Sequence, residues 1–158
     1  MTRTAEAGTL TALILETFRL NGRLLAAGDR LTRPDGQSSA RWQVLGALAA
    51  GPLTVADVAR RMGLTRQSVQ RTADLLAQGG LLAFTDNPRH RRAKLVTLTA
   101  RGRSVLAGID RRQVVWSNRL AAGLPLRDLR TARRVLEAVG RRLDEARGER
   151  AGSRGGER

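Results

Sequence analysis

The sequence predicts a mainly α-helical protein with one small β-hairpin, and three observations support this fold class. Apolar residues recur at helical spacing over most of the 158-residue chain. Two apolar, strand-like stretches, 81–85 and 93–99, flank a short basic loop. The chain length and a hydrophobic content of 41% suffice for one ordinary domain with a buried core.

The N-terminal part of the chain predicts two helices. Residues 1–8 are small and polar, and we expect them to be disordered. A helical period of apolar residues predicts a helix over 9–27, and the Gly, Pro and Asp content of 28–37 predicts a loop. Ser38 is placed to cap the next helix, which the Gly-Pro pair at 51–52 should end.

A helix-turn-helix pattern follows in the middle of the chain. Thr54 and Asp57 have the spacing of a capping box for a short helix, and Gly63 breaks that helix. Thr65 is placed to cap a second helix, which runs to Gln78. A short helix, a glycine turn and a second capped helix are typical of a helix-turn-helix. The hairpin directly after it predicts a winged helix-turn-helix domain with a two-stranded wing.

Two more helices are predicted in the C-terminal third. Thr99 is placed to cap the first, and Pro125 suits the first position of the second. The last helix repeats apolar residues in a heptad seam, formed by Leu129, Ala132, Leu136, Val139 and Leu143. A small winged domain cannot bury this seam alone, so we expect it to pair with a second copy; packing within the monomer is the alternative. The Gly-rich, charged tail 148–158 should be disordered.

Together these elements predict one unit over residues 9–147. The winged helix-turn-helix spans 38–102, and the flanking segments 9–27 and 103–147 are the predicted dimerisation helices. The residues expected to make the dimer contact are Leu10, Leu13, Phe18, Leu129, Leu136, Val139 and Leu143.

The chain is strongly basic, with a formal net charge of +15, and all of its 29 basic residues except Lys94 are arginine. Such a charge indicates nucleic acid or an anionic membrane surface as a partner. A GC-rich coding sequence would explain the preference for arginine over lysine, but not the net charge. No apolar run approaches the ~18 residues of a membrane span, and no secretory signal is visible. We therefore expect a cytoplasmic protein with no membrane partner.

Enzyme and metal chemistry find little support in the composition. There is no cysteine, which excludes disulfides, thiolate metal sites and thiol redox sensing. The single histidine, His90, has no serine or acid pair at a convincing spacing for nucleophilic catalysis. We therefore expect no enzyme activity, no metal and no cofactor, and interpret His90 as a hydrogen-bond donor to phosphate.

The helix over 65–78 has a polar face suited to reading DNA bases. At ~100° per residue one face collects Arg66, Gln67, Gln70, Arg71, Asp74 and Gln78. In the major groove, arginine forms bidentate hydrogen bonds with guanine, and glutamine forms them with adenine. The predicted DNA contacts on this helix are Thr65, Arg66, Gln67, Ser68, Gln70 and Arg71. A solvated helix face is the alternative, but it would favour glutamate and lysine, which this helix lacks.

The basic loop of the hairpin predicts a wing that meets the DNA backbone or minor groove. DNA supplies the counter-charge that the loop lacks, and arginine can enter a narrow minor groove. Pro88 stiffens the tip, and we expect Asp86 to pair with one wing arginine and aim it. The predicted wing contacts are Arg89, His90, Arg91, Arg92 and Lys94. A merely solvated hairpin is the alternative.

The stretch "LTVADVARRMGLTRQSVQRTADLLAQGGLLAFTDNPRHRRAKLVTLTARG" resembles the MarR family of winged-helix regulators, and the match covers 38–102. The family's Arg-Arg-Ala and Leu-Thr-x-x-Gly patterns fall on 91–93 and 98–102. His90 stands where the family commonly has an aspartate that braces the wing arginine. That brace is missing here unless Asp86 supplies the carboxylate. The resemblance implies an obligate homodimer with intertwined terminal helices. It also implies repression at pseudo-palindromic operators in double-stranded DNA, and release by a small aromatic ligand.

Several alternatives stay open at this point. Phe18, Trp42 and Trp116 either line a ligand pocket between the two halves or belong to the core. A non-specific architectural DNA-binding protein would use charge alone, but phosphate binding does not require Gln67 and Gln70. A protein-interaction module with a degenerate helix-turn-helix is the third class, and the basic wing argues against it.

Overall fold

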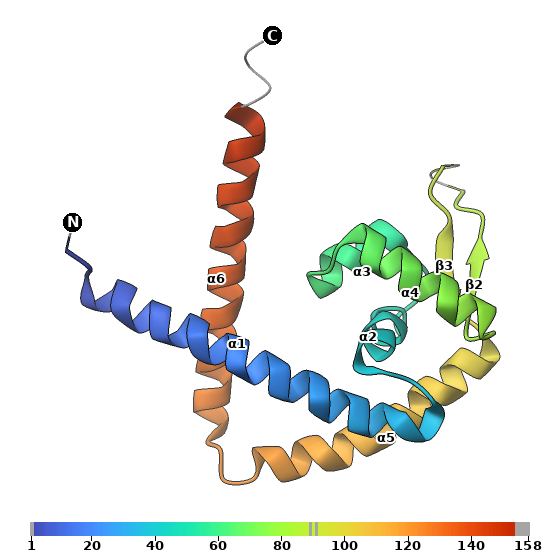
Figure 1. Ribbon diagram of the computed structural model, residues 1–158, viewed down its shortest axis with the longest axis horizontal. Coiled ribbons are helices and arrows are strands. Elements are labelled where there is room, and N and C mark those ends of the chain that lie inside the picture. Colours follow the sequence, from blue (N-terminus) through green and yellow to red (C-terminus); the bar gives the residue numbers. More distant parts are fainter. Residues whose placement is uncertain (1, 89, 91, 154–158) are drawn as a thin grey trace. The chain divides into compact units, whose positions relative to one another are not determined.

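The structure is a computed structural model, which describes residues 2–88, 90 and 92–153. Its chain divides into two compact units, Met1–Val115 and Trp116–Arg158. The elements, in order, are α1 (Ala5–Thr32), the short 3₁₀ helix η1 (Arg33–Asp35), α2 (Ser39–Ala47), β1 (Leu53–Thr54), α3 (Val55–Met62), α4 (Arg66–Gln78), β2 (Leu82–Thr85), β3 (Leu95–Leu98), α5 (Ala100–Ala121) and α6 (Leu126–Ser153) (Figure 1). The predicted mainly helical class with a winged helix-turn-helix is confirmed.

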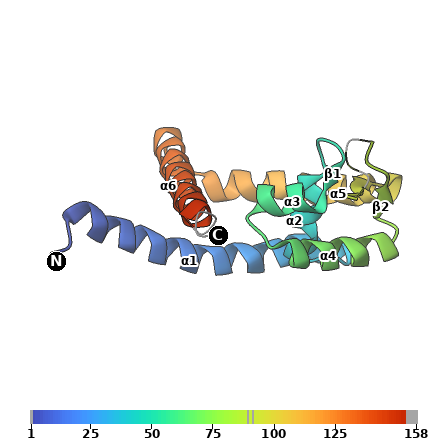
Figure 2. The same ribbon diagram turned by 90° about the horizontal axis from the view of Figure 1, so that it is seen from above.

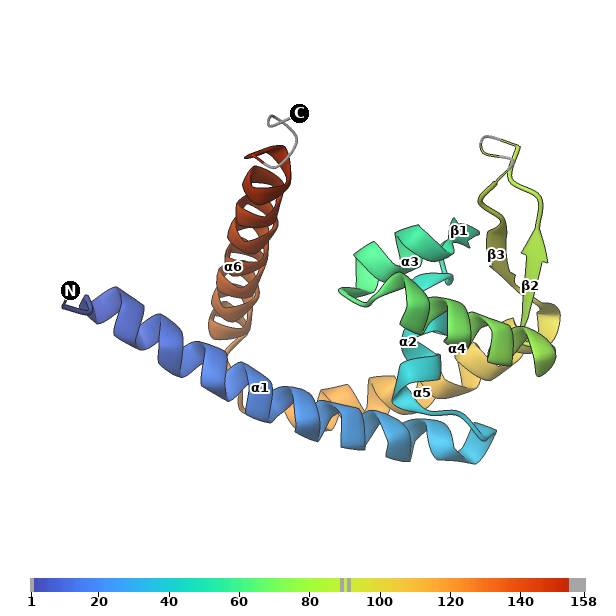
Figure 3. The ribbon, with the colours of Figure 1, turned by 45° about the horizontal axis from the view of Figure 1, so that its top comes forward.

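The wing belongs to a three-stranded antiparallel sheet in the order β1–β3–β2 (Figure 3). In the hairpin, Leu82 lies opposite Leu98 and Thr85 opposite Leu95. The sequence predicted only these two strands, because two-residue β1 is too short to show a period. Since Thr54 both ends β1 and caps α3, this strand joins the helix-turn-helix to the base of the wing.

The core of the first unit lies between α2, α3, α4 and the sheet. Figure 2 shows these elements close to one another. Its fully buried members include Leu45, Val58, Val69, Ala73, Leu76 and Val96. Ile109 of α5 is buried as well. Burying each of the larger of these side chains stabilises the fold by roughly 1.5–3 kcal/mol. The side of α4 away from its predicted polar face, with Val69, Ala73 and Leu76, is thus the side that packs.

Helix α1 is longer at both ends than the predicted 9–27. It begins at Ala5 because the Thr4 hydroxyl accepts a hydrogen bond from the N–H of Ala7, at 3.2 Å, so residues 5–8 are helical rather than disordered. It also continues through Gly28, where a loop was expected. A Cβ there would lie 2.8 Å from the Cβ of Ser39, so glycine permits close packing on α2 instead of breaking the helix.

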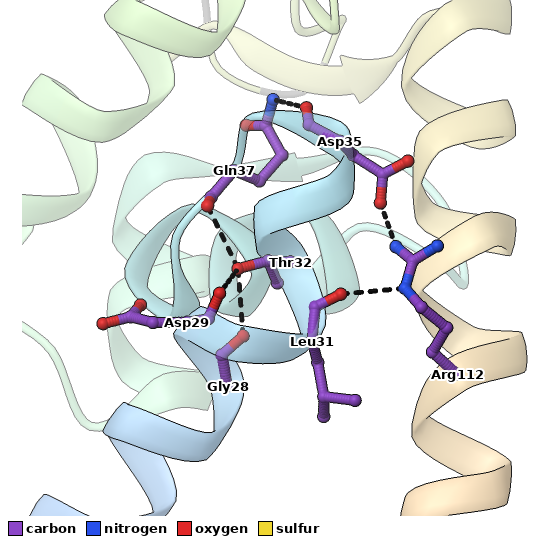
Figure 4. A network of polar contacts seen from close by, with 7 residues as sticks. All are labelled: Gly28, Asp29, Leu31, Thr32, Asp35, Gln37 and Arg112. Atoms are coloured by element: carbon purple, nitrogen blue, oxygen red, sulfur yellow. Dashed lines mark hydrogen bonds and ion pairs between the residues drawn. The ribbon is translucent and has the colours of Figure 1, made fainter.

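A polar network holds the end of α1 (Figure 4). The buried Thr32 hydroxyl lies 3.1 Å from the carbonyl oxygen of Gln37. From α5, Arg112 donates its Nε–H to the Leu31 carbonyl at 2.8 Å and forms an ion pair with Asp35. These contacts satisfy carbonyl groups that a helix end leaves without partners, and they fasten α1 to α5 within the first unit.

The second unit consists of the end of α5 and of α6. The turn between them uses Gly123 with a left-handed φ of 82°, a conformation that favours glycine. Helix α6 reaches Ser153, so residues 148–153 are helical where disorder was expected, and 154–158 lie outside the described residues. In the part of the chain that the structure describes, no helix is long and apolar enough to cross a bilayer.

Candidate nucleic-acid interface

Side-chain caps set the geometry of the helix-turn-helix. The Thr54 hydroxyl donates to Asp57 Oδ2 at 2.7 Å and accepts from the Asp57 N–H at 3.2 Å. The hydrogen bond from Thr54 is the largest cause that lowers the pKa of Asp57 below its ordinary value. Gly63 ends α3 with a φ of 65°, and Thr65 accepts from the Ser68 N–H at 3.1 Å. The predicted capping box, break and second cap are all confirmed.

Helix α4 presents a polar face to solvent. Five of the residues predicted to contact DNA are exposed on this helix, namely Arg66, Gln67, Ser68, Gln70 and Arg71, and Thr65 is its exposed N-cap. The helix has 13 residues and is therefore about 20 Å long. The major groove of B-DNA, about 12 Å wide, admits a helix of this kind.

A groove of about 780 Å³ lies between α4 and the wing. Helix α4 contributes Arg66, Gln67, Gln70 and Asp74, and the wing loop contributes Arg92, Ala93 and Lys94. Val55 and Phe84 add apolar side chains to the lining. The groove thus brings predicted base-reading residues next to predicted wing residues. Among its described lining residues, three side chains are cationic and Asp74 is the one carboxylate. This apolar part of the lining was missed, because only the fold places Val55 of α3 beside the wing and Phe84 of β2 along the groove.

The remaining predicted wing residues lie apart from this groove or outside the described chain. His90 is exposed and lines a second cavity of about 540 Å³, together with Asn87 and Pro88. Arg89 and Arg91 lie outside the described residues. Asp86 is exposed, and its expected pairing with a wing arginine stays a prediction.

Several arginines donate to main-chain carbonyl groups instead of facing a groove. Arg61 reaches the carbonyl of Ala47 at 3.3 Å, and Arg103 reaches that of Leu98 at 2.7 Å. Arg101 donates to the carbonyl of Gly79 at 3.1 Å. Arginine near the C-terminal end of a helix is a known signal for such capping, but Arg101 and Arg103 lie in the first turn of α5, so the sequence did not predict their contacts. Part of the positive charge therefore stabilises the fold.

The apolar residues predicted to make a dimer contact are mostly exposed in the single chain. On α1, Leu10 and Leu13 are partly exposed, and Phe18 is 69% exposed. On α6, Leu129, Leu136 and Leu143 are exposed as well, while Val139 is half-buried. Large apolar side chains are therefore exposed on each of these two helices in the single chain.

The three aromatic residues of the predicted ligand pocket lie in different surroundings. Trp42 is half-buried and packs against the core cluster, and Phe18 is exposed. Trp116 is half-buried in the second unit. Among the described residues, no group of three or more His, Asp or Glu side chains is placed to hold a metal ion.

Comparison with known proteins adds an independent finding. Residues 35–93 match the MarR family. An uncharacterised protein of Mycobacterium tuberculosis is 42% identical over 112 residues, which cover 71% of this chain and 78% of that protein. The transcriptional activatory protein BadR of Rhodopseudomonas palustris is 31% identical over 97 residues, or 59% of this chain and 55% of BadR.

A solved structure gives the same picture for the fold. The transcriptional regulator MosR of Mycobacterium tuberculosis, crystallised in complex with DNA, matches with a TM-score of 0.73 at 24% identity. The match covers 85% of this chain and 97% of MosR. The fold is therefore shared, over most of both chains, with a protein crystallised in complex with DNA.

Proposed function

This chain belongs to the MarR family of DNA-binding transcription regulators, which are not enzymes, and from this premise we propose that it is a sequence-specific repressor. It acts as a homodimer on a pseudo-palindromic operator, in the cytoplasm. The observation that carries the proposal is the groove that joins Gln67 and Gln70 of α4 to Arg92 and Lys94 of the wing.

In this proposal α4 enters the major groove and reads base edges. Arg66, Gln67 and Gln70 are exposed on one helix face, where their side chains can form bidentate hydrogen bonds with guanine or adenine. The wing lies along the adjacent backbone, where Arg92 and Lys94 contact phosphate or enter the minor groove. The helix thus supplies most of the specificity, and the wing supplies most of the salt-dependent affinity.

The main alternative is an architectural protein that holds any duplex by charge. The net charge of +15 alone would suit that function. Arg61, Arg101 and Arg103, however, direct their guanidinium groups to carbonyl oxygens. The face of α4 is instead rich in glutamine, which adds nothing to purely electrostatic binding. These two facts favour sequence-specific DNA binding over non-specific binding.

The homodimer is supported by the exposed apolar residues of α1 and α6. A seam in which Leu136 is 47% exposed and Leu143 is 62% exposed costs free energy in water, and a second copy can cover it. A two-fold dimer presents two copies of α4. Their half-sites should lie about one helical turn, or about 34 Å, apart on one side of the duplex.

The sign of regulation and the effector belong to the same proposal. Repression and release by a small aromatic ligand are implied by the family, whereas the relative BadR is named an activator. The exposed Phe18 and the half-buried Trp42 and Trp116 are the candidates for a ligand contact. A reporter gene placed behind the bound site distinguishes repression from activation. A screen of aromatic acids for a change in DNA affinity tests the effector.

The central experiment first selects bound sites from a random duplex library. The chain is then titrated against the selected operator, a variant with ~5 bp inserted between half-sites, and a random duplex, at two salt concentrations. We expect tight binding to the operator and a large loss for both other duplexes. Equal affinity for all three would identify the protein as a charge-driven architectural binder.

A further inference from the structure

We infer that Asp74 is a positioning residue that fixes which edge of the Gln70 amide faces the DNA base. The inference rests on the proposed sequence-specific binding and deepens it. Gln70 Nε2 donates to Asp74 Oδ1 at 2.8 Å, and both residues line the groove between α4 and the wing. They are four residues apart in the helix, so their side chains are neighbours on its surface.

The chemistry of the pair determines the orientation of the amide. An ionised carboxylate only accepts hydrogen bonds, so the NH₂ group of Gln70 must turn towards Asp74. The amide oxygen of Gln70 then turns away from Asp74. A free glutamine on the same helix could rotate its amide by 180° and present either edge. The carboxylate removes that freedom before DNA arrives, and so lowers the entropy lost on binding.

A carboxylate in this groove weakens phosphate binding. Arg66, Arg92 and Lys94 line the same groove and favour an anionic partner. The negative charge of Asp74 opposes that attraction, so its presence lowers the affinity for every duplex alike. A gain in discrimination between bases is the compensating effect that the hydrogen bond to Gln70 provides.

The fixed orientation selects one purine. With its oxygen free and one N–H left over, Gln70 accepts from the N6 amino group of adenine and donates to N7. Guanine offers two acceptors at the same edge, O6 and N7, and the Gln70 oxygen would oppose O6. Guanine can pair only with the N–H donors of the amide, and the hydrogen bond to Asp74 turns that NH₂ group away from the base and occupies one of its donors. Asp74 therefore makes Gln70 prefer adenine to guanine.

The test compares base preferences from selected duplex libraries for the wild type, Asp74→Asn, Gln70→Ala and the double variant. The asparagine introduced by Asp74→Asn keeps the size of the side chain but can donate to the Gln70 oxygen, so both amide orientations become available. We expect Asp74→Asn to lower the adenine-over-guanine ratio by at least about threefold at one position per half-site. That position should be the one at which Gln70→Ala loses its preference. Binding to random duplex should strengthen at the same time.

Two controls separate this effect from charge and from folding. Glu16→Gln makes the same change of net charge on α1, where the acid pairs with Arg19, and it should leave all base preferences unchanged. In the Gln70→Ala background, Asp74→Asn should no longer alter the ratio, because the residue acts through Gln70. Melting curves verify that the variants are folded.

The outcomes separate the inference from the proposed function. If the wild type enriches no sequence, the proposed function fails. If the wild type enriches an operator but Asp74→Asn keeps the full adenine preference, the inference alone is wrong. A loss of preference spread over many positions, or one that persists in the Gln70→Ala background, also overturns it.

Discussion

The carboxylate of Asp29 accepts a hydrogen bond of 2.7 Å from the backbone N–H of Ser39 and so joins the end of α1 to the start of α2. That N–H is one of the four that a helix start leaves without an intrahelical partner. Negative charge is also favourable at a helix N-terminus. The hydrogen bond from the backbone of Ser39 is the largest cause that lowers the pKa of Asp29.

Acid should loosen this junction. Because the pKa of Asp29 is lower in the folded than in the unfolded chain, its stabilising contribution is present above the unfolded pKa, about 3.8. It is lost as the pH falls through the folded-state pKa. Asp57, whose pKa is also lowered, contributes in the same window. Asp29→Asn should therefore be less stable than the wild type at neutral pH and lose less stability on acidification.

Urea unfolding between about pH 7 and about pH 3 measures the difference. Glu16→Gln changes an exposed acid on the same helix and serves as the control. Its free energy of unfolding at neutral pH should equal that of the wild type. Parallel pH profiles for Asp29→Asn and the wild type would mean that this carboxylate does not contribute to the acid dependence.

A close approach of two backbones predicts the effect of a single methyl group. Gly102 lies in the first turn of α5, and a Cβ there would overlap the carbonyl oxygen of Leu81. The Thr99 hydroxyl accepts from the Gly102 N–H at 3.0 Å and holds this turn in place. Gly102→Ala should destabilise the protein by about 1–3 kcal/mol, since a backbone atom cannot move aside as a side chain can.

The matched control is Gly46→Ala, because a Cβ on that helical glycine would meet nothing within 4 Å. It should be neutral or stabilising by up to about 1 kcal/mol, the difference in helix propensity. Urea unfolding of both variants gives the two free energies. Equal stability of Gly102→Ala and the wild type would contradict this packing of α5 against the sheet.

The seam of α6 predicts the oligomeric state. Leu136→Asp places a charge in the middle of the apolar repeat, so it should dissociate or unfold the dimer. Thr131→Asp adds the same charge to the same helix outside the seam and should leave the dimer intact. Sedimentation equilibrium at micromolar concentration measures both. A wild type that sediments as a folded monomer would refute the dimer.

Local signals made most of the winged domain predictable. Thr54, Gly63 and Thr65 each act on residues within one helical turn, so their roles follow from spacing alone, and the structure confirms them. Likewise the polar face of α4 followed from the helical period. Where a structural role depends on neighbours in sequence, the sequence was enough.

Features that depend on distant neighbours were missed. Gly28 looked like a loop residue, but the nearby Ser39 makes it a packing position inside α1. Arg112 gave no sign that it would meet Leu31 and Asp35, which lie far from it in the chain. Such contacts arise from tertiary packing, which overrides local propensity and has no period that can be counted.

The last prediction separates discrimination between base sequences from general affinity for DNA. Gln70→Ala removes a two-armed group from the exposed face of α4, so it should cost about 1–3 kcal/mol of discrimination at one base pair per half-site. Its affinity for random duplex should change little. Arg92→Ala removes a cation from the wing side of the groove instead. It should lower the affinity for all duplexes by a similar factor. It should also reduce the slope of log affinity against log salt by about 0.9 per lost phosphate contact.

Titrations of both variants against operator and random duplex, at several salt concentrations, measure these two signatures. Arg19→Ala is the control, because it removes the same charge from an exposed position on α1. Since charges more than a Debye length of about 10 Å from the DNA are screened, its salt slope should stay close to that of the wild type. If Gln70→Ala and Arg92→Ala instead lose affinity for every duplex in the same proportion, α4 does not read bases. If Arg92→Ala leaves the salt slope unchanged, its guanidinium does not contact phosphate.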